Sequence, residues 1–381
     1  MFLSDVGTSA AAPQILLFLV SELGTPMSVA GLFYLTNLAA PIAGYFVGNY
    51  SDRVGERLDL FRLCAGAGFL GWAGVALSTS AWMPYLMSTL LLAFSRAASS
   101  QIFAAVHDDL HRNSAHGGEG VVAVVRMALT AGWVIGPVAG AWLAAETSSR
   151  TLFWGTAICF LVQIVPLGTR RAHSVSRKVA TDLSSGMYDR RGWRAMLPLL
   201  VFTGLWVLVY AGEPIKYGFL PIYLDEQLKP DPVIRGAIIG IQPLVEFVLM
   251  PFCVMLSRRI GILWLMSIAA ALGFAGNLCF ATWHSTAGIF AGQILMGAVW
   301  GVFGALGIIV AQRLLPQAVA TASAIYMSSS ALSSALGGVT GGVGVALVGL
   351  PNVFLFPALF AALAAIGLGA MARSEIFIRI R

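Results

Sequence analysis

The chain has 381 residues, of which 58% are hydrophobic and only 10% are charged, and its mean hydropathy is +0.83. Soluble domains carry about 25% charged residues, so this composition cannot cover a surface exposed to water. The apolar residues come in blocks of about twenty, which is the length a helix needs to cross the hydrocarbon core of a bilayer. Spanning strands would give short alternating segments instead. We therefore expect an all-α integral membrane protein in a lipid bilayer.

Apolar blocks separated by charged or turn-rich breaks predict twelve membrane-spanning helices. Their approximate ranges are 2–20, 28–49, 61–79, 84–106, 120–144, 152–168, 197–222, 235–256, 261–281, 286–311, 318–346 and 352–372. Most breaks are short, as at 80–84 and 146–151, and short connections join antiparallel neighbours. The four cysteines all fall inside apolar blocks and none has ligand spacing, which indicates small packing residues.

One break is different, because residues 169–196 are polar and contain seven basic side chains. It divides the spans into six before and six after, the pattern of two helix bundles joined by a linker. The predicted organisation is an N-terminal six-helix bundle over 1–168, a cytoplasmic linker over 169–196, a C-terminal six-helix bundle over 197–372, and a cytoplasmic tail over 373–381.

The basic residues are distributed unevenly between the two sides of the predicted membrane. Loops and ends on the side of the linker hold seventeen of the 23 lysines and arginines, whereas the opposite loops hold only Arg150, Lys229 and Arg235. Cytoplasmic loops carry such an excess. We therefore expect a multi-pass protein of the cell (inner) membrane with both termini cytoplasmic. The net charge of +6 then reflects membrane orientation and not a nucleic-acid partner.

The break after the second predicted span contains a recognisable motif, Gly48-Asn49-Tyr50-Ser51-Asp52-Arg53-Val54-Gly55-Glu56-Arg57. It resembles the cytoplasmic loop signature of the major facilitator superfamily. A carboxylate there can face a helix N-terminus while arginines bind carbonyl ends or acidic partners, which would form a conformational gate. The alternative is an ordinary positively charged turn. The gate residues that the resemblance implies are Gly48, Asp52, Arg53, Gly55 and Arg57. The corresponding point of the second half, 257–261, has Arg258 in place of the aspartate.

The fifth predicted span contains Gly132-Trp133-Val134-Ile135-Gly136-Pro137. It resembles the glycine-proline motif of exporters in the same superfamily. Glycines four positions apart let two helices approach closely, and proline kinks a helix. This motif favours export, with Gly132, Gly136 and Pro137 as further gate residues, although paired glycines are common in membrane helices.

Within the superfamily, the chain resembles the sugar efflux transporter family. The resemblance is carried by Ala12-Pro13, by Gly31-Leu32-Phe33-Tyr34 with Asn37, by Arg126 ahead of the glycine-proline motif, by Glu246, and by Gln312 before Pro316. It implies the major facilitator fold, with twelve helices in two six-helix bundles, and export of sugars or similar polar solutes.

Few ionisable residues fall inside the predicted spans, and such residues are candidates for function because burying them in lipid is costly. Glu246 is the strongest candidate, with Gln242 one turn earlier on the same face. Burial disfavours a charged carboxylate, which suits a group that loads and unloads protons. Arg126 and Arg96 are its expected electrostatic partners. The alternative is that Glu246 is a structural acid paired with a cation.

The seventh predicted span places Trp206, Tyr210, Glu213 and Tyr217 on one helical stripe. Sugars suit such a surface, since their C–H groups lie on aromatic faces while their hydroxyls bond acids and amides. Packing or an interfacial belt is the alternative for each aromatic, and Glu213 and Lys216 could neutralise each other. The predicted substrate cavity is lined by Tyr34, Asn37, Gln242, Trp133, Trp206, Tyr210, Glu213, Gln293 and Trp300.

The sequence has no phosphate-binding loop and no catalytic motif, so we expect neither an enzyme nor a cofactor. His107 and His111 are spaced like metal ligands, but solvated charges at a helix end explain them better than a metal site. The leading hypothesis is a monomeric, proton-coupled exporter of sugar-like solutes that works by alternating access. The alternatives are a multidrug-type exporter of the same superfamily and, third, a non-transporting membrane sensor.

Overall fold

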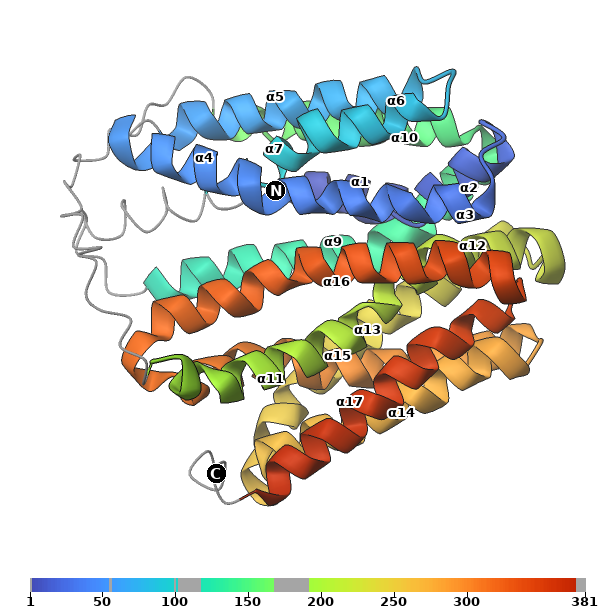
Figure 1. The fold of residues 1–381 in the computed structure, drawn as a ribbon. Coiled ribbons are helices and arrows are strands. Elements are labelled where there is room, and N and C mark those ends of the chain that lie inside the picture. Colours follow the sequence, from blue (N-terminus) through green and yellow to red (C-terminus); the bar gives the residue numbers. More distant parts are fainter. Residues whose placement is uncertain (1, 55–56, 99–100, 102–117, 168–191, 375–381) are drawn as a thin grey trace. The chain divides into compact units, whose positions relative to one another are not determined.

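The computed structural model describes residues 2–54, 57–98, 101, 118–167 and 192–374, with the side chains of 52–53, 57, 118–130, 167, 192–195 and 320 outside the description. The described residues form helices and connecting turns, and contain no strand (Figure 1). The chain forms two compact units, one of residues 1–25 and 36–182 and the other of residues 26–35 and 183–381.

The first unit contains the helices that precede the linker, apart from α3 (Met27–Gly31). Their bounds are α1 (Phe2–Ala11), α2 (Gln14–Ser21), α4 (Ala39–Val54), α5 (Arg57–Ala76), α6 (Trp82–Met87), the π-helical turn η2 (Ser88–Leu92), α7 (Ala93–Ser95), α9 (Gly118–Glu146), α10 (Ser149–Val162) and the 3-10 turn η3 (Val165–Leu167). The 3-10 helix η1 (Leu32–Leu38) crosses the boundary between the units.

The second unit begins with α3 (Met27–Gly31) and continues after the linker. Its other helices are α11 (Gly192–Tyr210), α12 (Gly212–Tyr223), η4 (Leu224–Leu228), α13 (Pro232–Ile260), α14 (Ile262–Thr282), α15 (Thr286–Leu314), η5 (Pro316–Ala318), α16 (Val319–Val348), η6 (Asn352–Phe354) and α17 (Leu355–Arg373). The pairs α13 with α15 and α14 with α17 pack along their lengths (Figure 1).

In the described part of the chain, eight helices are long and apolar enough to cross a membrane. The pair α1 and α2, bent by 41° at the break before Gln14, would make a ninth span. Trp82–Ser95 and Ser149–Val162 are shorter apolar helices. Each of the twelve predicted spans overlaps a helix, which confirms the all-α membrane class, while the count of twelve crossings stays a prediction.

The glycine-proline motif of α9 lies where α9 packs against α1. Ser9 Oγ donates a hydrogen bond to the carbonyl of Gly132 at 2.9 Å. A Cβ atom at Gly140 would lie 2.7 Å from Cβ of Ala10, and one at Gly136 would overlap Ser9 Oγ. The glycines are therefore required for the close approach of these two helices.

Arg150 of α10 connects three helical segments of the first unit. Its Nη1 donates to the carbonyl of Ala76 at 2.8 Å, which caps the C-terminal end of α5, and its Nε donates to Glu22 at 3.1 Å. The same guanidinium lies 5.3 Å from the ring centroid of Phe18. One cation thus ties three helical segments together.

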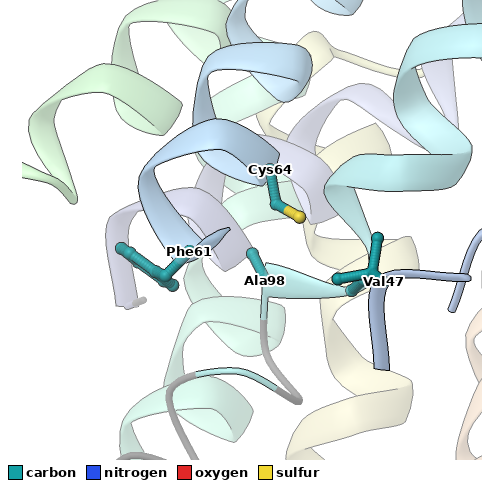
Figure 2. Close-up of a cluster of buried hydrophobic side chains, with 5 residues drawn as sticks. Val47, Phe61, Cys64 and Ala98 are labelled. Atoms are coloured by element: carbon teal, nitrogen blue, oxygen red, sulfur yellow. The ribbon is translucent and has the colours of Figure 1, made fainter. Parts of the chain in front are cut away.

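A hydrophobic cluster packs α4 and α5 against the segment after α7 (Figure 2). It consists of Val47, Phe61, Cys64, Ala97 and Ala98. Val47 and Cys64 also border a groove of 960 Å³ whose lining is mainly apolar. The burial of Cys64 agrees with the packing role expected for the cysteines.

Candidate functional site

A buried polar network lies in the second unit and includes Glu213, near the start of α12. The exposed fraction is 7% for Glu213 and 1% for Lys216. Lys216 Nζ donates to both carboxylate oxygens of Glu213, at 2.7 and 2.8 Å, and to Oε1 of Gln242 on α13. Trp300 of α15 donates its indole N–H to Glu213 Oε1 at 2.7 Å, and Gln242 Nε2 donates to Oε2 at 3.4 Å.

A short interruption between α11 and α12 places Glu213 and Lys216 in this position. The N–H of Ala211 still bonds to the carbonyl of Val207 at 2.9 Å, and α12 starts at Gly212. Pro214 fits there because the first turn of a helix needs no internal N–H donor. Gly337 of α16 packs directly on Ala211 and Pro214. The pairing of Glu213 with Lys216, three residues apart, follows from helical geometry.

Glu246 lies one turn beyond Gln242 on α13 and is half-buried. It interacts electrostatically with both Glu213 and Lys216. Its Oε1 atom lies 3.3 Å from the Cβ position of Gly304, so α15 has a glycine, without a side chain, at that point. Within the described residues Glu246 makes no hydrogen bond or ion pair, which distinguishes it from Glu213.

Aromatic rings lie next to the network. Trp206 stacks on Tyr210 with ring centroids 4.8 Å apart, and Tyr210 meets Trp300 edge-on at 5.1 Å. Tyr326 of α16 lies 4.8 Å from Trp206. Tyr326 was not predicted from the sequence, since it stands in the serine-rich span at 318–346 with no aromatic neighbour at helical spacing.

One buried donor near the network, the phenol of Tyr34, has no hydrogen-bond partner among the described residues. Tyr34 belongs to η1 and is electrostatically coupled to Glu213 and Tyr217. The indole of Trp206 is hydrogen-bonded to Tyr326. A buried polar group without a partner is costly, so the Tyr34 hydroxyl is available for a ligand that carries hydroxyl groups.

Gln293 of α15 lies about two turns before Trp300, which separates it from the network. Its Nε2 donates to the carbonyl of Ile238 at 2.9 Å, and its Oε1 is buried without a partner in the described part of the chain. Its predicted place in the substrate cavity stays a prediction.

The predicted site residues of the first unit have their own contacts. Arg96 Nη2 donates to Oδ1 of Asn37 at 2.8 Å. Trp133 hydrogen-bonds the carboxylate of Asp5, across the interface of α1 and α9. The side chain of Arg126 lies outside the described residues, so its predicted role stays a prediction, as does that of Arg96.

Most of the predicted gate motif after α4 also lies outside the described residues, namely Gly55 and the side chains of Asp52, Arg53 and Arg57. Gly48 is described and has open space around it. Its neighbour Ser51 donates to Oε1 of Gln101 at 2.6 Å. His107 and His111 are outside the description as well, and the described part contains no group of three possible metal ligands.

Comparison with known proteins places the chain in a family. The model of the MFS_1 like family matches residues 2–356. The chain belongs to that family. This family assignment confirms the major facilitator resemblance of the sequence motifs.

Relatives of known name extend along nearly the whole chain. A putative sugar efflux transporter of Deinococcus radiodurans is 28% identical over 360 residues, covering 93% of this chain and 92% of that protein. Sugar efflux transporter A of Dickeya chrysanthemi is 24% identical over 345 residues, covering 90% and 86%. Sugar efflux transporter C of Escherichia coli is 24% identical over 353 residues, again covering 90% and 86%.

Solved structures show the same fold. The nucleoside transporter NupG superposes with a TM-score of 0.78 at 15% identity, covering 98% of this chain and 97% of that one. A peptide transporter POT in complex with sulfate gives 0.74 at 13%, covering 97% and 92%. The relatives and these structures are membrane transporters, and the chain is a multi-pass membrane transporter rather than an enzyme.

Proposed function

We propose that the protein exports sugars or similar small polar solutes in exchange for protons, by alternating access between its two helix bundles. The observation that carries the proposal is the Glu213 network with its aromatic neighbours and the adjacent Glu246. The sugar efflux transporters among its relatives support the substrate class.

The chemistry of the site suits an uncharged polyhydroxyl compound. The faces of Trp206 and Tyr326 offer apolar area for the C–H groups of a sugar ring, and the buried hydroxyl of Tyr34 offers a partner for one of its hydroxyls. Glu246 adds an acid that can accept a hydroxyl when ionised and donate to one when protonated.

Proton coupling is assigned to Glu246. It is an acid inside an apolar helix, it has no hydrogen bond in the described part of the chain, and it lies close enough to Lys216 and Glu213 for their charges to affect it. Such a group can change its proton occupancy without breaking a hydrogen-bond network, which suits a carrier that loads on one side and unloads on the other.

Alternating access is supported by the packing of α3 on α16. A Cβ atom at Gly31 would lie 2.8 Å from the backbone of Gly342, and one at Gly338 would lie 2.7 Å from the carbonyl of Gly31. The predicted N-terminal bundle contains α3, yet α3 groups with the second unit. We propose that this contact between small residues is a gate that opens and closes during transport.

The orientation follows from the charge distribution. The excess of arginine and lysine on the side of the linker supports cytoplasmic termini in the cell (inner) membrane. The gate between α3 and α16 would then lie on the external side. We propose that the working unit is a monomer, with lipid, protons and the solute as its partners.

The experiment is transport of radiolabelled lactose in membrane vesicles, with and without an imposed pH gradient. The proposal expects gradient-dependent lactose movement by the wild type. No lactose movement, together with gradient-driven movement of a lipophilic cationic dye, would favour a multidrug-type exporter, which the aromatic rings of the site would also suit. Movement of neither probe would support the non-transporting sensor.

A further inference from the structure

We propose that Lys216 is the positioning residue of this site, holding the carboxylate of Glu213 in a filled hydrogen-bond network so that Glu246 is the acid of the described cluster that exchanges a proton. The inference rests on the proposed proton coupling and deepens it, because it sets the number of protons that the site handles. Lys216 was not among the predicted site residues.

The hydrogen bonds make Lys216 the centre of the network. An ammonium group has three N–H donors, and Lys216 directs Nζ to three oxygens, two on Glu213 and one on Gln242. Its Nζ also lies 4.5 Å from the ring centroid of Tyr217. A buried cation with all of its donors used by the protein is held in one position and is not free to bind an anionic substrate.

The carboxylate of Glu213 is equally occupied by hydrogen bonds. Its carboxylate accepts from Lys216 on both oxygens, from Trp300 on Oε1 and from Gln242 on Oε2. Protonation would place a donor where four donors already point, so it would break part of the network. The proton therefore goes to Glu246, whose carboxylate has no such donors in the described part of the chain.

The charge of the cluster gives the proton count. Two carboxylates and one ammonium sum to one negative charge, and one proton on Glu246 makes the cluster neutral in its apolar surroundings. Among the described residues, the other titratable groups coupled to this cluster are the phenols of Tyr34, Tyr210 and Tyr217, which are neutral at physiological pH. Helix α15 packs against α13 with glycines at 297, 301 and 304 and has no ionisable side chain before Arg313, and α14 has none besides Cys279. The described cluster therefore exchanges one proton.

The proposal predicts that the two charges of the pair act on Glu246 in opposite directions. Lys216→Gln removes the positive charge of the pair, so the cluster becomes more negative and Glu246 keeps its proton to higher pH. Glu213→Gln leaves one positive and one negative charge, so Glu246 loses its proton at lower pH. In the double variant Glu213→Gln with Lys216→Gln, only Glu246 is charged, and its titration returns toward that of the wild type.

The test is a pH titration of the infrared band of protonated carboxylic acids in the purified full-length protein, which needs no substrate. The difference between wild type and Glu246→Gln isolates the band of Glu246. The expected result is a midpoint raised in Lys216→Gln and lowered in Glu213→Gln, each by on the order of one pH unit, and restored in the double variant. Thermal unfolding of each variant checks that it is folded, and Lys216→Met replaces Lys216→Gln if the latter is not.

Two results would show that Lys216 has only a structural role. One is an unchanged midpoint of the Glu246 titration in the single variants, and the other is a midpoint in the double variant that does not return toward the wild-type value. If the Glu246 band of the wild type does not change with pH, the assignment of Glu246 as the proton carrier in the proposed function is wrong instead. The two failures are distinguishable, because the first leaves a pH-dependent wild-type band and the second does not.

Discussion

Trp300 donates its indole N–H to the carboxylate of Glu213 at 2.7 Å, although the two residues stand 87 positions apart and belong to different helices. The contact places an aromatic ring and an acid on one buried network, together with Lys216 and Gln242. It connects α15 to the interruption between α11 and α12. Its strength can be tested by substitution.

Trp300→Phe keeps an aromatic ring beside Tyr210 and removes the donor to Glu213. A hydrogen bond to a charged group contributes about 1.5–3 kcal/mol, so we expect a lower free energy of unfolding by about that amount and slower lactose transport. Thermal unfolding in detergent and vesicle transport measure the two effects. Trp283→Phe is the matched control, since Trp283 is 53% exposed. Equal stability of the two variants would contradict the role of the hydrogen bond.

Tyr34→Phe removes a buried hydroxyl that has no partner in the described part of the chain. Stability should be unchanged or slightly higher, because an unpaired polar group is lost. If the hydroxyl binds substrate, lactose affinity should fall by roughly tenfold, which corresponds to about 1.4 kcal/mol. Equilibrium binding of labelled lactose measures it, with Tyr45→Phe as control because Tyr45 is 69% exposed. Unchanged affinity would remove Tyr34 from the binding site.

Gly136→Ala should weaken the contact of α9 with α1, because the new Cβ atom would overlap Ser9 Oγ and lie 2.6 Å from the carbonyl of Val6. We expect a loss of about 1–3 kcal/mol, as overpacking typically costs. Gly44→Ala is the control in the same unit, since no atom lies within 4 Å of its Cβ position. The measurement is the free energy of unfolding of each variant. Equal values would show that α1 and α9 can move apart without a loss of stability.

Gly342→Leu should hold α3 away from α16, because the Cβ position of Gly342 already overlaps the carbonyl of Ser28. A cysteine introduced at Ser28 into a variant without native cysteines should then react faster with a membrane-impermeant maleimide added from outside. Lactose transport should slow, since the gate cannot close. Unchanged labelling would indicate that the α3–α16 contact is not a gate.

Local and compositional features were the predictable part of the structure. The apolar blocks predicted helices over every described span, and spacing predicted the pairing of Glu213 with Lys216. A buried ion pair needs hydrogen-bond partners. The sequence could not show that Gln242 and Trp300 are the partners of this pair, because they lie on other helices. Side-chain contacts between distant helices depend on packing that hydropathy does not encode.

The same limit explains what sequence reasoning missed. Tyr326 lies among serines, so its contact with Trp206 becomes visible only when α16 is packed against α11. The grouping of α3 with the second unit depends on glycines of α16 some 300 residues later in the chain. Lys216 was read as a charge that neutralises Glu213, whereas its bond to Gln242 makes it the centre of a network.

The most direct test of the central claim is simultaneous measurement of lactose and proton movement in proteoliposomes that contain the purified protein. Coupling is reciprocal, so a lactose gradient imposed without a pH gradient must move protons in the opposite direction. We predict about one proton per lactose for the wild type, from the single exchangeable acid of the cluster, and no proton movement for Glu246→Gln. Lactose flux without protons in the wild type, or an unchanged proton flux in Glu246→Gln, would contradict proton-coupled export through Glu246.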